Sequence, residues 1–381
     1  MTMKKIVIAP DSFKGSMSAR MVADAVERGL RRILGNTCHY TIIPMADGGE
    51  GTVAALEFAH QAQRVTTQTV DPIQRPIHAT YAISSDGNTA IIEMAEASGL
   101  QLLTEDERDP RYTSTYGTGR LLRDALDRGV SKIILGIGGS ATNDGGAGLF
   151  EALGVQFLNH QQQPIQRGGI YLNDLATLDC THIHPRLKDV TLHVACDVSN
   201  PLLGPSGASA IYGPQKGATA DIVALLDDAL AHYHTILERT THRDVQRIPG
   251  SGAAGGTGAA LLAFTDAKLQ PGIDIVLNET AFSKHVAHAD LVITGEGALD
   301  AQTSYGKTPI GVARAAKQYH VPVIAITGKL APGYETVYHH GIDAIFPITP
   351  GPIPIKEALC DAPLHVERTA ENIARLIKLE L

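Results

Sequence analysis

Short apolar runs that end in polar, glycine-containing loops constrain the fold of this chain more than any other feature. The first run, residues 6–10, leads through a loop into a segment with apolar residues at helical spacing. A continuous apolar run is typical of a parallel strand that is buried on both faces. The same order of strand, loop and helix returns after about residue 273. This alternation predicts an open parallel α/β sheet that is built from both ends of the chain.

The middle of the chain has a different pattern. Residues 64–70 and 77–84 are extended segments that follow one another without a helix, and a turn leads into a third at 90–95. Successive strands of this kind predict antiparallel or mixed pairing. We therefore predict two α/β domains, one Rossmann-like with an open parallel sheet, and one inserted into it with a mixed sheet. Their expected limits are 1–62 with 275–381 for the first, and 63–274 for the second.

The composition excludes several classes of protein. A chain of 381 residues suits two domains, and with a net charge of -8 and no basic stripe it is not expected to bind nucleic acid. No apolar stretch is long enough to cross a membrane, and the run at 6–9 is too short for a signal peptide. The four cysteines lie far apart without CxxC spacing, which fits a reducing cytoplasm. A homodimer is compatible with this size.

Ligands of open parallel sheets bind beyond the carboxyl ends of the strands, so the loops that directly follow strands are the candidate site. After the first strand, Lys14 stands beside Ser12 at the start of a helix, an arrangement that can hold an anion. For this loop alone, a polar turn with a solvated lysine is the simpler interpretation. After the second strand, Asp47 and Glu50 stand among three glycines. These carboxylates could hold Mg²⁺ or orient a hydroxyl, or they could only form a turn and cap a helix.

The loop at 136–146 is the densest in glycine, hydroxyl and acidic side chains. It contains G-x-G-x-x-A, as dinucleotide sites do, but the acidic residue expected about 20 positions on is not evident. Ser140, Thr142 and the backbone N–H groups suit phosphate oxygens, so a phosphate-binding loop is favoured. The glycine tract 250–258 also matches G-x-G-x-x-G. Because no strand leads into this tract, a packed or flexible loop is its simpler interpretation.

Two further loops carry acidic residues after strands. The segment 295–308 ends like a P-loop, but Ala301 replaces the first glycine. The preceding strand is expected to end near Thr294, too far back for a true P-loop, which is therefore rejected. The carboxylates of this segment, together with Lys307 and a helix start, still suit phosphate chemistry. Asp197 follows another apolar run, where it is a candidate base or metal ligand, or the cap of a loop.

The types of side chain in these loops limit the reactions that the protein could catalyse. The 16 histidines show no metal-ligand spacing such as HExxH, and most of them, including His234 on a helix, are interpreted as solvated. The loops together offer several carboxylates and three lysines, Lys14, Lys216 and Lys307, without a redox cysteine pair or a Ser-His-Asp signature. Phosphoryl transfer requires mainly positioning and charge neutralisation from the protein. The inventory therefore fits an enzyme that transfers a phosphoryl group.

These segments resemble, in the same order, the sequence blocks of the bacterial glycerate kinase family, type 1. The blocks are residues 10–16, 46–52, 138–148, 196–202, 213–218 and 295–309. The resemblance runs from about residue 4 to the C-terminus, and six blocks in order are more specific than any one of them. It implies ATP- and Mg²⁺-dependent phosphorylation of D-glycerate to 2-phosphoglycerate, which uses carbon from glucarate, galactarate or glyoxylate. It also implies two α/β domains with the active site in the cleft between them.

This hypothesis gives each candidate residue a role. Lys14 and Ser12 hold the acid carboxylate or the transferring phosphoryl group, an aspartate takes the hydroxyl proton, and N–H groups with a lysine bind the ATP phosphates. The expected catalytic residues are Lys14, Asp144 and Asp197, and the expected substrate contacts are Asp11, Ser12 and Lys216. The expected nucleotide contacts are Gly138, Gly139, Ser140, Thr142 and Lys307, and the expected Mg²⁺ ligands are Asp47, Glu50 and Asp300.

Three alternatives stay open at this point. A glycerate 3-kinase would give 3-phosphoglycerate, because the sequence itself does not identify the hydroxyl that is phosphorylated. A nicotinamide-dependent hydroxy-acid oxidoreductase is suggested by the glycine fingerprints and weakened by their missing acidic partner. A titration with NAD(H) would reveal it. A non-catalytic sensor of small acids would bind glycerate without turning over ATP.

Overall fold

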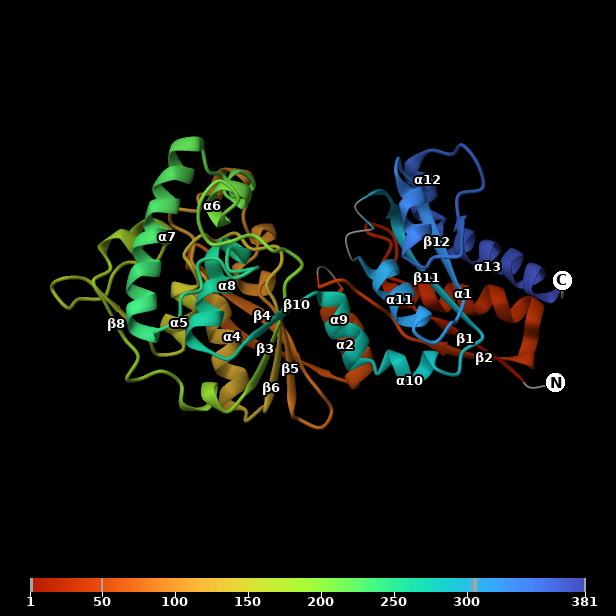
Figure 1. Ribbon diagram of the computed structural model, residues 1–381, viewed down its shortest axis with the longest axis horizontal. Coiled ribbons are helices and arrows are strands. Elements are labelled where there is room, and N and C mark those ends of the chain that lie inside the picture. The colour runs from red at the N-terminus through yellow and green to blue at the C-terminus, as the bar shows by residue number, and fades with distance from the viewer. Residues whose placement is uncertain (1–2, 49–50, 302, 304–306, 380–381) are drawn as a thin grey trace. The chain divides into compact units, whose positions relative to one another are not determined.

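The computed structural model describes residues 3–48, 51–301, 303 and 307–379, and it contains two compact units (Figure 1). Unit 1 comprises Met1–His60 and Pro271–Leu381, and unit 2 comprises Gln61–Gln270. Unit 1 contains a parallel sheet and unit 2 a mixed sheet, each with helices, which confirms the predicted α/β fold class. Within the described ranges, no helix is both long and apolar enough to cross a membrane.

The sheet of unit 1 has the strand order β13-β12-β11-β1-β2, and all its pairs are parallel. Its strands are β1 (Lys4–Ile8), β2 (Cys38–Ile42), β11 (Leu291–Leu299), β12 (Val323–Leu330) and β13 (Ala344–Pro347). Because β1 lies between β2 and β11, the strand order reverses at β1. Open α/β sheets usually bind ligands at such a reversal, beyond the carboxyl ends of the strands.

Helices from both segments of unit 1 accompany this sheet. They are α1 (Ala19–Leu34), α2 (Thr52–His60), α9 (Gly272–Glu279), α10 (Phe282–Val286), α11 (Thr308–Lys317), α12 (Ile355–Cys360) and α13 (Ala362–Lys378). The first and last helices, α1 and α13, lie side by side (Figure 1). Val26 and Leu30 of α1 are buried in one cluster with Val366 and Ile373 of α13. This packing joins the first and last segments of the chain in one apolar core.

The sheet of unit 2 has the strand order β10-β9-β6-β5-β4-β3. Its strands are β3 (Gln63–Val70), β4 (Pro76–Ile83), β5 (Thr89–Glu93), β6 (Lys132–Gly136), β9 (Thr191–Ala195) and β10 (Lys268–Gln270). The pairs from β3 to β5 are antiparallel and those from β5 to β10 are parallel, which confirms the predicted mixed sheet. A separate antiparallel pair consists of β7 (Gln156–Leu158) and β8 (Thr177–Asp179).

The glycine tract of unit 2 is a packing element. The helices of this unit are α3 (Ala95–Ser98), α4 (Tyr116–Asp127), α5 (Ala147–Ala152), α6 (Ala208–Tyr212), α7 (Ala220–Thr241) and α8 (Ala253–Phe264). The tract 250–258 leads into α8, where Gly255 has a φ of +66°. A Cβ on Gly255 would lie 2.0 Å from the carbonyl oxygen of Thr142, so only glycine allows these two backbone segments to approach. The tract is therefore a tightly packed segment, which confirms the simpler interpretation of this motif.

Candidate active site

A pocket of about 590 Å³ lies at the carboxyl ends of the unit 1 strands. Its lining comes from the loops after β1, β2 and β13, from the ends of β11 and β12 and the residues that follow β11, and from α12 with the start of α13. The charged side chains that line it are Asp11, Lys14, Asp47, Glu296, Asp300, Lys307 and Lys329. Because the pocket lies at the reversal between β1 and β11, it occupies the place where sheets of this type bind ligands.

Asp11 is a buried carboxyl group at the end of β1. One of its oxygens accepts a hydrogen bond from the Thr308 hydroxyl at the start of α11, and the other accepts one from Ser12 N. Burial raises the pKa of Asp11 to about 6, although the Thr308 hydrogen bond opposes the increase. The nearby Asp47 carboxylate raises this pKa further. Asp11 therefore exchanges its proton close to neutral pH, within the range useful for acid–base chemistry.

Glu296 is one of the carboxylates of the segment 295–308, and the sequence analysis gave it no role of its own. Burial raises its pKa to about 7, and the Asp11 and Asp300 carboxylates contribute to the increase. Two contacts oppose it: the Thr303 hydroxyl donates a 2.7 Å hydrogen bond to Oε1, and the Lys307 Nζ lies 4.0 Å from Oε2. The missed signal is strand length, because β11 continues to Leu299 and carries Glu296, whereas the strand was expected to end near Thr294.

The pocket also contains predicted residues from both segments of unit 1. Ser12 and Lys14 lie in the loop after β1, and Asp47 lies in the loop after β2. Asp300 directly follows β11, and Lys307, which directly precedes α11, lies 3.8 Å from its Oδ1 atom. The fold thus brings together side chains that are almost 300 positions apart in the sequence.

The acidic residues of the pocket fit a divalent cation. Asp47 raises the pKa of Asp11, and Asp300 raises the pKa of Glu296, so the carboxylates repel one another. A cation among them would relieve this repulsion, and carboxylate oxygens are ligands that Mg²⁺ prefers. Glu50, the remaining expected ligand, lies outside the described residues.

In unit 2, the Asp144 carboxylate is fully buried, and both of its oxygens accept hydrogen bonds from the protein. Its Oδ2 atom accepts hydrogen bonds from Thr115 N, the Thr115 hydroxyl and Gly148 N, and its Oδ1 atom accepts one from Gly146 N. Burial raises the pKa of Asp144, and these hydrogen bonds lower it. The position suits a carboxylate that fixes the loop, and it does not support the expected role as proton acceptor from a substrate.

Lys216 is also enclosed in unit 2, with 1% of its surface exposed. Its Nζ atom donates hydrogen bonds to the Ser140 hydroxyl at 2.8 Å and to the Thr142 carbonyl oxygen at 2.7 Å. Burial lowers the pKa of Lys216 to about 7, against the attraction of Asp144. The ammonium group thus holds the loop from inside, which does not support the expected contact with substrate. The Thr142 side chain is equally buried, so a direct phosphate contact from its hydroxyl is not supported either.

The other expected residues of unit 2 have more exposed positions. Gly138 and Gly139 are exposed after β6, and Ser140 is buried behind them. Asp197 is exposed in the loop after β9. Of the site residues predicted in unit 2, Gly138, Gly139 and Asp197 are therefore the ones exposed to a ligand.

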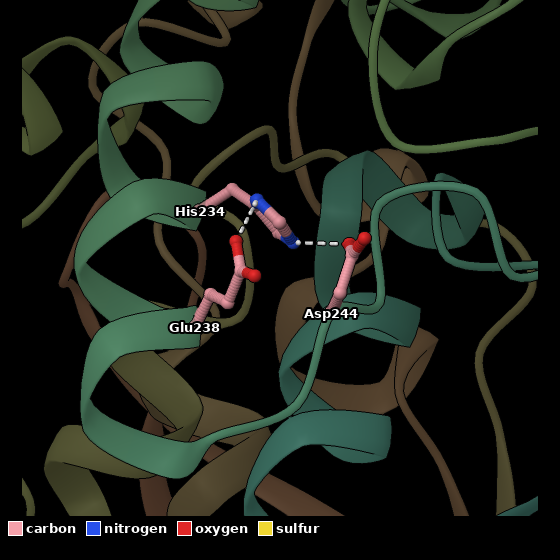
Figure 2. Close-up of side chains that lie close together, drawn as sticks. All are labelled: His234, Glu238 and Asp244. Atoms are coloured by element: carbon pink, nitrogen blue, oxygen red, sulfur yellow. Dashed lines mark ion pairs between the residues drawn. The ribbon is translucent and has the colours of Figure 1, made fainter.

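A polar cluster on α7 contains the buried His234 (Figure 2). Asp244 Oδ1 lies 3.4 Å from Nε2 of the ring, and Glu238 Oε2 lies 4.0 Å from Nδ1. Val245 N also donates a hydrogen bond to Nε2. Because the carboxylates face different ring nitrogens, the cluster fits a link between α7 and the next loop better than a metal site. The expectation that His234 is solvated is wrong, since only 5% of the residue is exposed.

Comparison with known proteins identifies the class to which this fold and site belong. The sequence model of the glycerate kinase family matches residues 6–378. The chain is 54% identical over 372 residues to the glycerate kinase of Halalkalibacterium halodurans, covering 98% of both chains. It is 47% identical over 375 residues to the glycerate 2-kinase of Escherichia coli, again covering 98% of both. A crystal structure of a Salmonella typhimurium protein assigned as glycerate kinase 2 matches with a TM-score of 0.92 and 47% identity, covering 99% of both chains.

The chain therefore belongs to the glycerate kinase family. It is an enzyme and a phosphotransferase, as the sequence resemblance implied.

Proposed function

We propose that this kinase transfers the γ-phosphoryl group of ATP to the 2-hydroxyl of D-glycerate. The relative from Escherichia coli that is named glycerate 2-kinase supports the choice of hydroxyl. The observation that carries the proposal is the unit 1 pocket, where acidic residues and lysines converge at the strand-order reversal. Such a set provides what phosphoryl transfer requires, namely charge neutralisation and positioning.

The acidic residues of the pocket are proposed to bind the metal ion, and its lysine and serine residues are proposed to bind anionic groups. Asp47 and Asp300 are the proposed Mg²⁺ ligands, directly or through water, and Glu50 stays a predicted ligand. When bound, Mg²⁺ would neutralise charge on the phosphates. Lys14 and Ser12 are proposed to hold the acid carboxylate or the transferring phosphoryl group. Their position in the pocket supports these roles.

The hydroxyl proton needs an acceptor with a pKa close to the working pH. Asp11 and Glu296 have pKa values raised to about 6 and about 7, and both line the pocket. We therefore add them to Asp197, which stays a candidate because it is exposed after β9. Such a base contributes about 10²–10⁴-fold to the rate.

The phosphate contacts are proposed for two places. Lys307 lines the unit 1 pocket. In unit 2, Gly138 and Gly139 can offer backbone N–H groups, with Ser140 directly behind them. The cleft between domains, the cytoplasmic location, the homodimer and the use of sugar-acid or glyoxylate carbon stay predictions.

A coupled assay with MgATP, D-glycerate and enolase tests the proposal. A signal with enolase alone identifies 2-phosphoglycerate as the product and supports the proposed hydroxyl. A signal that requires added phosphoglycerate mutase identifies 3-phosphoglycerate and overturns the choice of hydroxyl. Folded protein that releases no ADP in the presence of Mg²⁺ and D-glycerate would overturn the proposed reaction.

A further inference from the structure

The unit 1 pocket combines its charged lining with an apolar wall, which we define as Ile348, Ile355, Ala358 and Leu359. We infer that this wall binds the nucleobase of the phosphoryl donor, while the lysines of the same pocket bind its phosphates. The inference rests on the proposed function, and it assigns the base of the donor nucleotide to unit 1.

The size and chemistry of the pocket do not match a three-carbon acid alone. D-Glycerate consists of a carboxylate and two hydroxyl groups on a short chain, so it has almost no apolar surface to cover. A pocket of about 590 Å³ is in the range of sites that hold much larger ligands. The surplus volume and the apolar wall therefore indicate a second ligand part that is large and flat, such as a purine.

The two most exposed side chains of the wall share one face of α12. Ile355 is 78% exposed and Leu359 is 42% exposed. Residues four positions apart in a helix lie above one another, so both side chains present apolar surface to the same space. Both line the pocket. A base that covers them removes this surface from water, which favours binding.

The wall is tied to the charged part of the pocket. The Ser16 hydroxyl donates a 2.7 Å hydrogen bond to the carbonyl oxygen of Leu359. Ser16 belongs to the loop after β1 that also carries Asp11 and Lys14. One loop therefore fixes the position of α12 relative to the groups that handle charge, as a site for an amphiphilic ligand requires.

The charged part of the pocket suits a phosphate chain. Lys14, Lys307 and Lys329 supply positive charge. Gly297 and Gly328 also line the pocket, and they present no side chain to a ligand. This glycine surface allows a ligand to approach the backbone closely. Lysines beside bare backbone are suitable partners for phosphate oxygens.

The test is a double variant of the wall, Ile355→Ser with Leu359→Ser. Its control is Leu376→Ser, since Leu376 is 52% exposed on α13 and is not among the residues that line the pocket. Calorimetric titration compares MgADP with magnesium tripolyphosphate, which has phosphates but neither base nor ribose. We expect the double variant to bind MgADP at least about tenfold more weakly and tripolyphosphate within about twofold of the wild type. In assays, KM for ATP rises while KM for glycerate stays unchanged.

Three results would overturn the inference. Unchanged MgADP affinity shows that the wall holds no base. An equal loss for both probes shows that the wall only shapes the pocket. A higher KM for glycerate at constant KM for ATP assigns the wall to the acid. Wild-type enzyme that releases no ADP from ATP and glycerate overturns the proposed function instead, and the MgADP titration then still tests the wall.

Discussion

The loops that line the unit 1 pocket and the loop 138–148 of unit 2 contain the same types of residue but place them in different environments. Both follow parallel strands, and both are rich in glycine, hydroxyl and acidic residues. In the pocket, Asp11 and Glu296 line open space and repel neighbouring carboxylates. In unit 2, Asp144 of the loop accepts hydrogen bonds from the surrounding protein, and Lys216, which lies outside the loop, donates hydrogen bonds to Ser140 and Thr142 of the loop.

The difference teaches that residue types alone do not separate a ligand-binding loop from a packed loop. What differs is whether the charged groups border a pocket that a ligand can enter, as Asp11 and Glu296 do, or are enclosed on every side, as Asp144 and Lys216 are. Asp144 has four donors and Lys216 has two acceptors, all in unit 2. The glycines of such a loop serve close backbone packing, as Gly255 does against Thr142.

The largest expected effect is on activity, from Lys14→Met in the pocket. Removing a positive group that contacts the substrate or the transferring phosphoryl group should lower kcat/KM by about 10²–10³-fold. Steady-state kinetics with MgATP and D-glycerate measure the effect. Stability should change little because Lys14 is exposed.

The matched control is Lys284→Met, which removes an exposed lysine of α10, outside the pocket lining. Its kcat/KM should equal that of the wild type. Near-normal turnover by the Lys14 variant would show that the pocket lysine has no catalytic role, and it would weaken the contrast between the two regions.

The second effect is on stability, from Lys216→Met, which removes the lysine that contacts the loop. Burial lowers the pKa of Lys216 from 10.5 to about 7. Between these values the unfolded chain holds the proton and the folded chain releases it, so wild-type stability rises with pH in this window. The slope approaches about 1.4 kcal/mol per pH unit. The Tm of the wild type minus that of the variant should therefore increase from pH 7 to about pH 9.5.

Lys188→Met, at an exposed position of unit 2, provides the control and should show no such trend. If the Tm difference for Lys216→Met does not vary with pH, then the lysine is not enclosed as described. The charged groups of the loop would then be open to solvent like those of the pocket, and the difference between the two regions would disappear.

The third effect concerns Mg²⁺ and the pocket carboxylates. Because burial raises the pKa values of Asp11 and Glu296, their folded forms hold protons more tightly than the unfolded chain. This contribution to stability is present at low pH and is lost as pH rises through about 6 to 7. Mg²⁺ on the proposed ligands Asp47 and Asp300 would favour the ionised forms of the neighbouring Asp11 and Glu296, so it should raise Tm more at about pH 8 than at about pH 5.5.

Glu296→Gln should reduce this pH dependence, since the variant lacks one of the two titrating groups. Thermal unfolding with and without MgCl₂ provides the measurement. An equal Tm shift at both pH values would show that the ion does not bind next to Asp11 and Glu296 and would contradict its assignment to Asp47 and Asp300.

Much of the fold could be predicted because local patterns determine it. Continuous apolar runs identified the parallel strands, and successive extended segments identified the mixed sheet. Asp11, Lys14 and Asp47 could be singled out because the carboxyl ends of neighbouring parallel strands lie at one edge of a sheet. These predictions required only strand order and loop position.

The remainder depended on contacts between distant parts of the chain. Glu296 received no role of its own because β11 extends to Leu299 along β12, and this pairing is not visible in the sequence of β11. Asp144 is enclosed by Thr115, which lies 29 positions away, and Lys216 reaches Ser140 over 76 positions. Burial and hydrogen-bond partners of this kind follow from tertiary packing, so no local pattern could predict them.

The smallest expected effect comes from His234→Ala, which tests whether polar clusters of unit 2 serve structure. Loss of the ring removes the acceptor of the Val245 N–H group, and it also removes the close approach of Asp244 to the ring (Figure 2).

The free energy of unfolding should fall by about 1 kcal/mol, the net contribution of one hydrogen bond, with kcat/KM unchanged. Glu238→Gln is the milder control, because Glu238 is half exposed and its ion pair spans 4.0 Å. Stabilisation of the wild type by Zn²⁺ that disappears in His234→Ala would instead assign a metal to this cluster, and unit 2 would then contain a ligand site of its own.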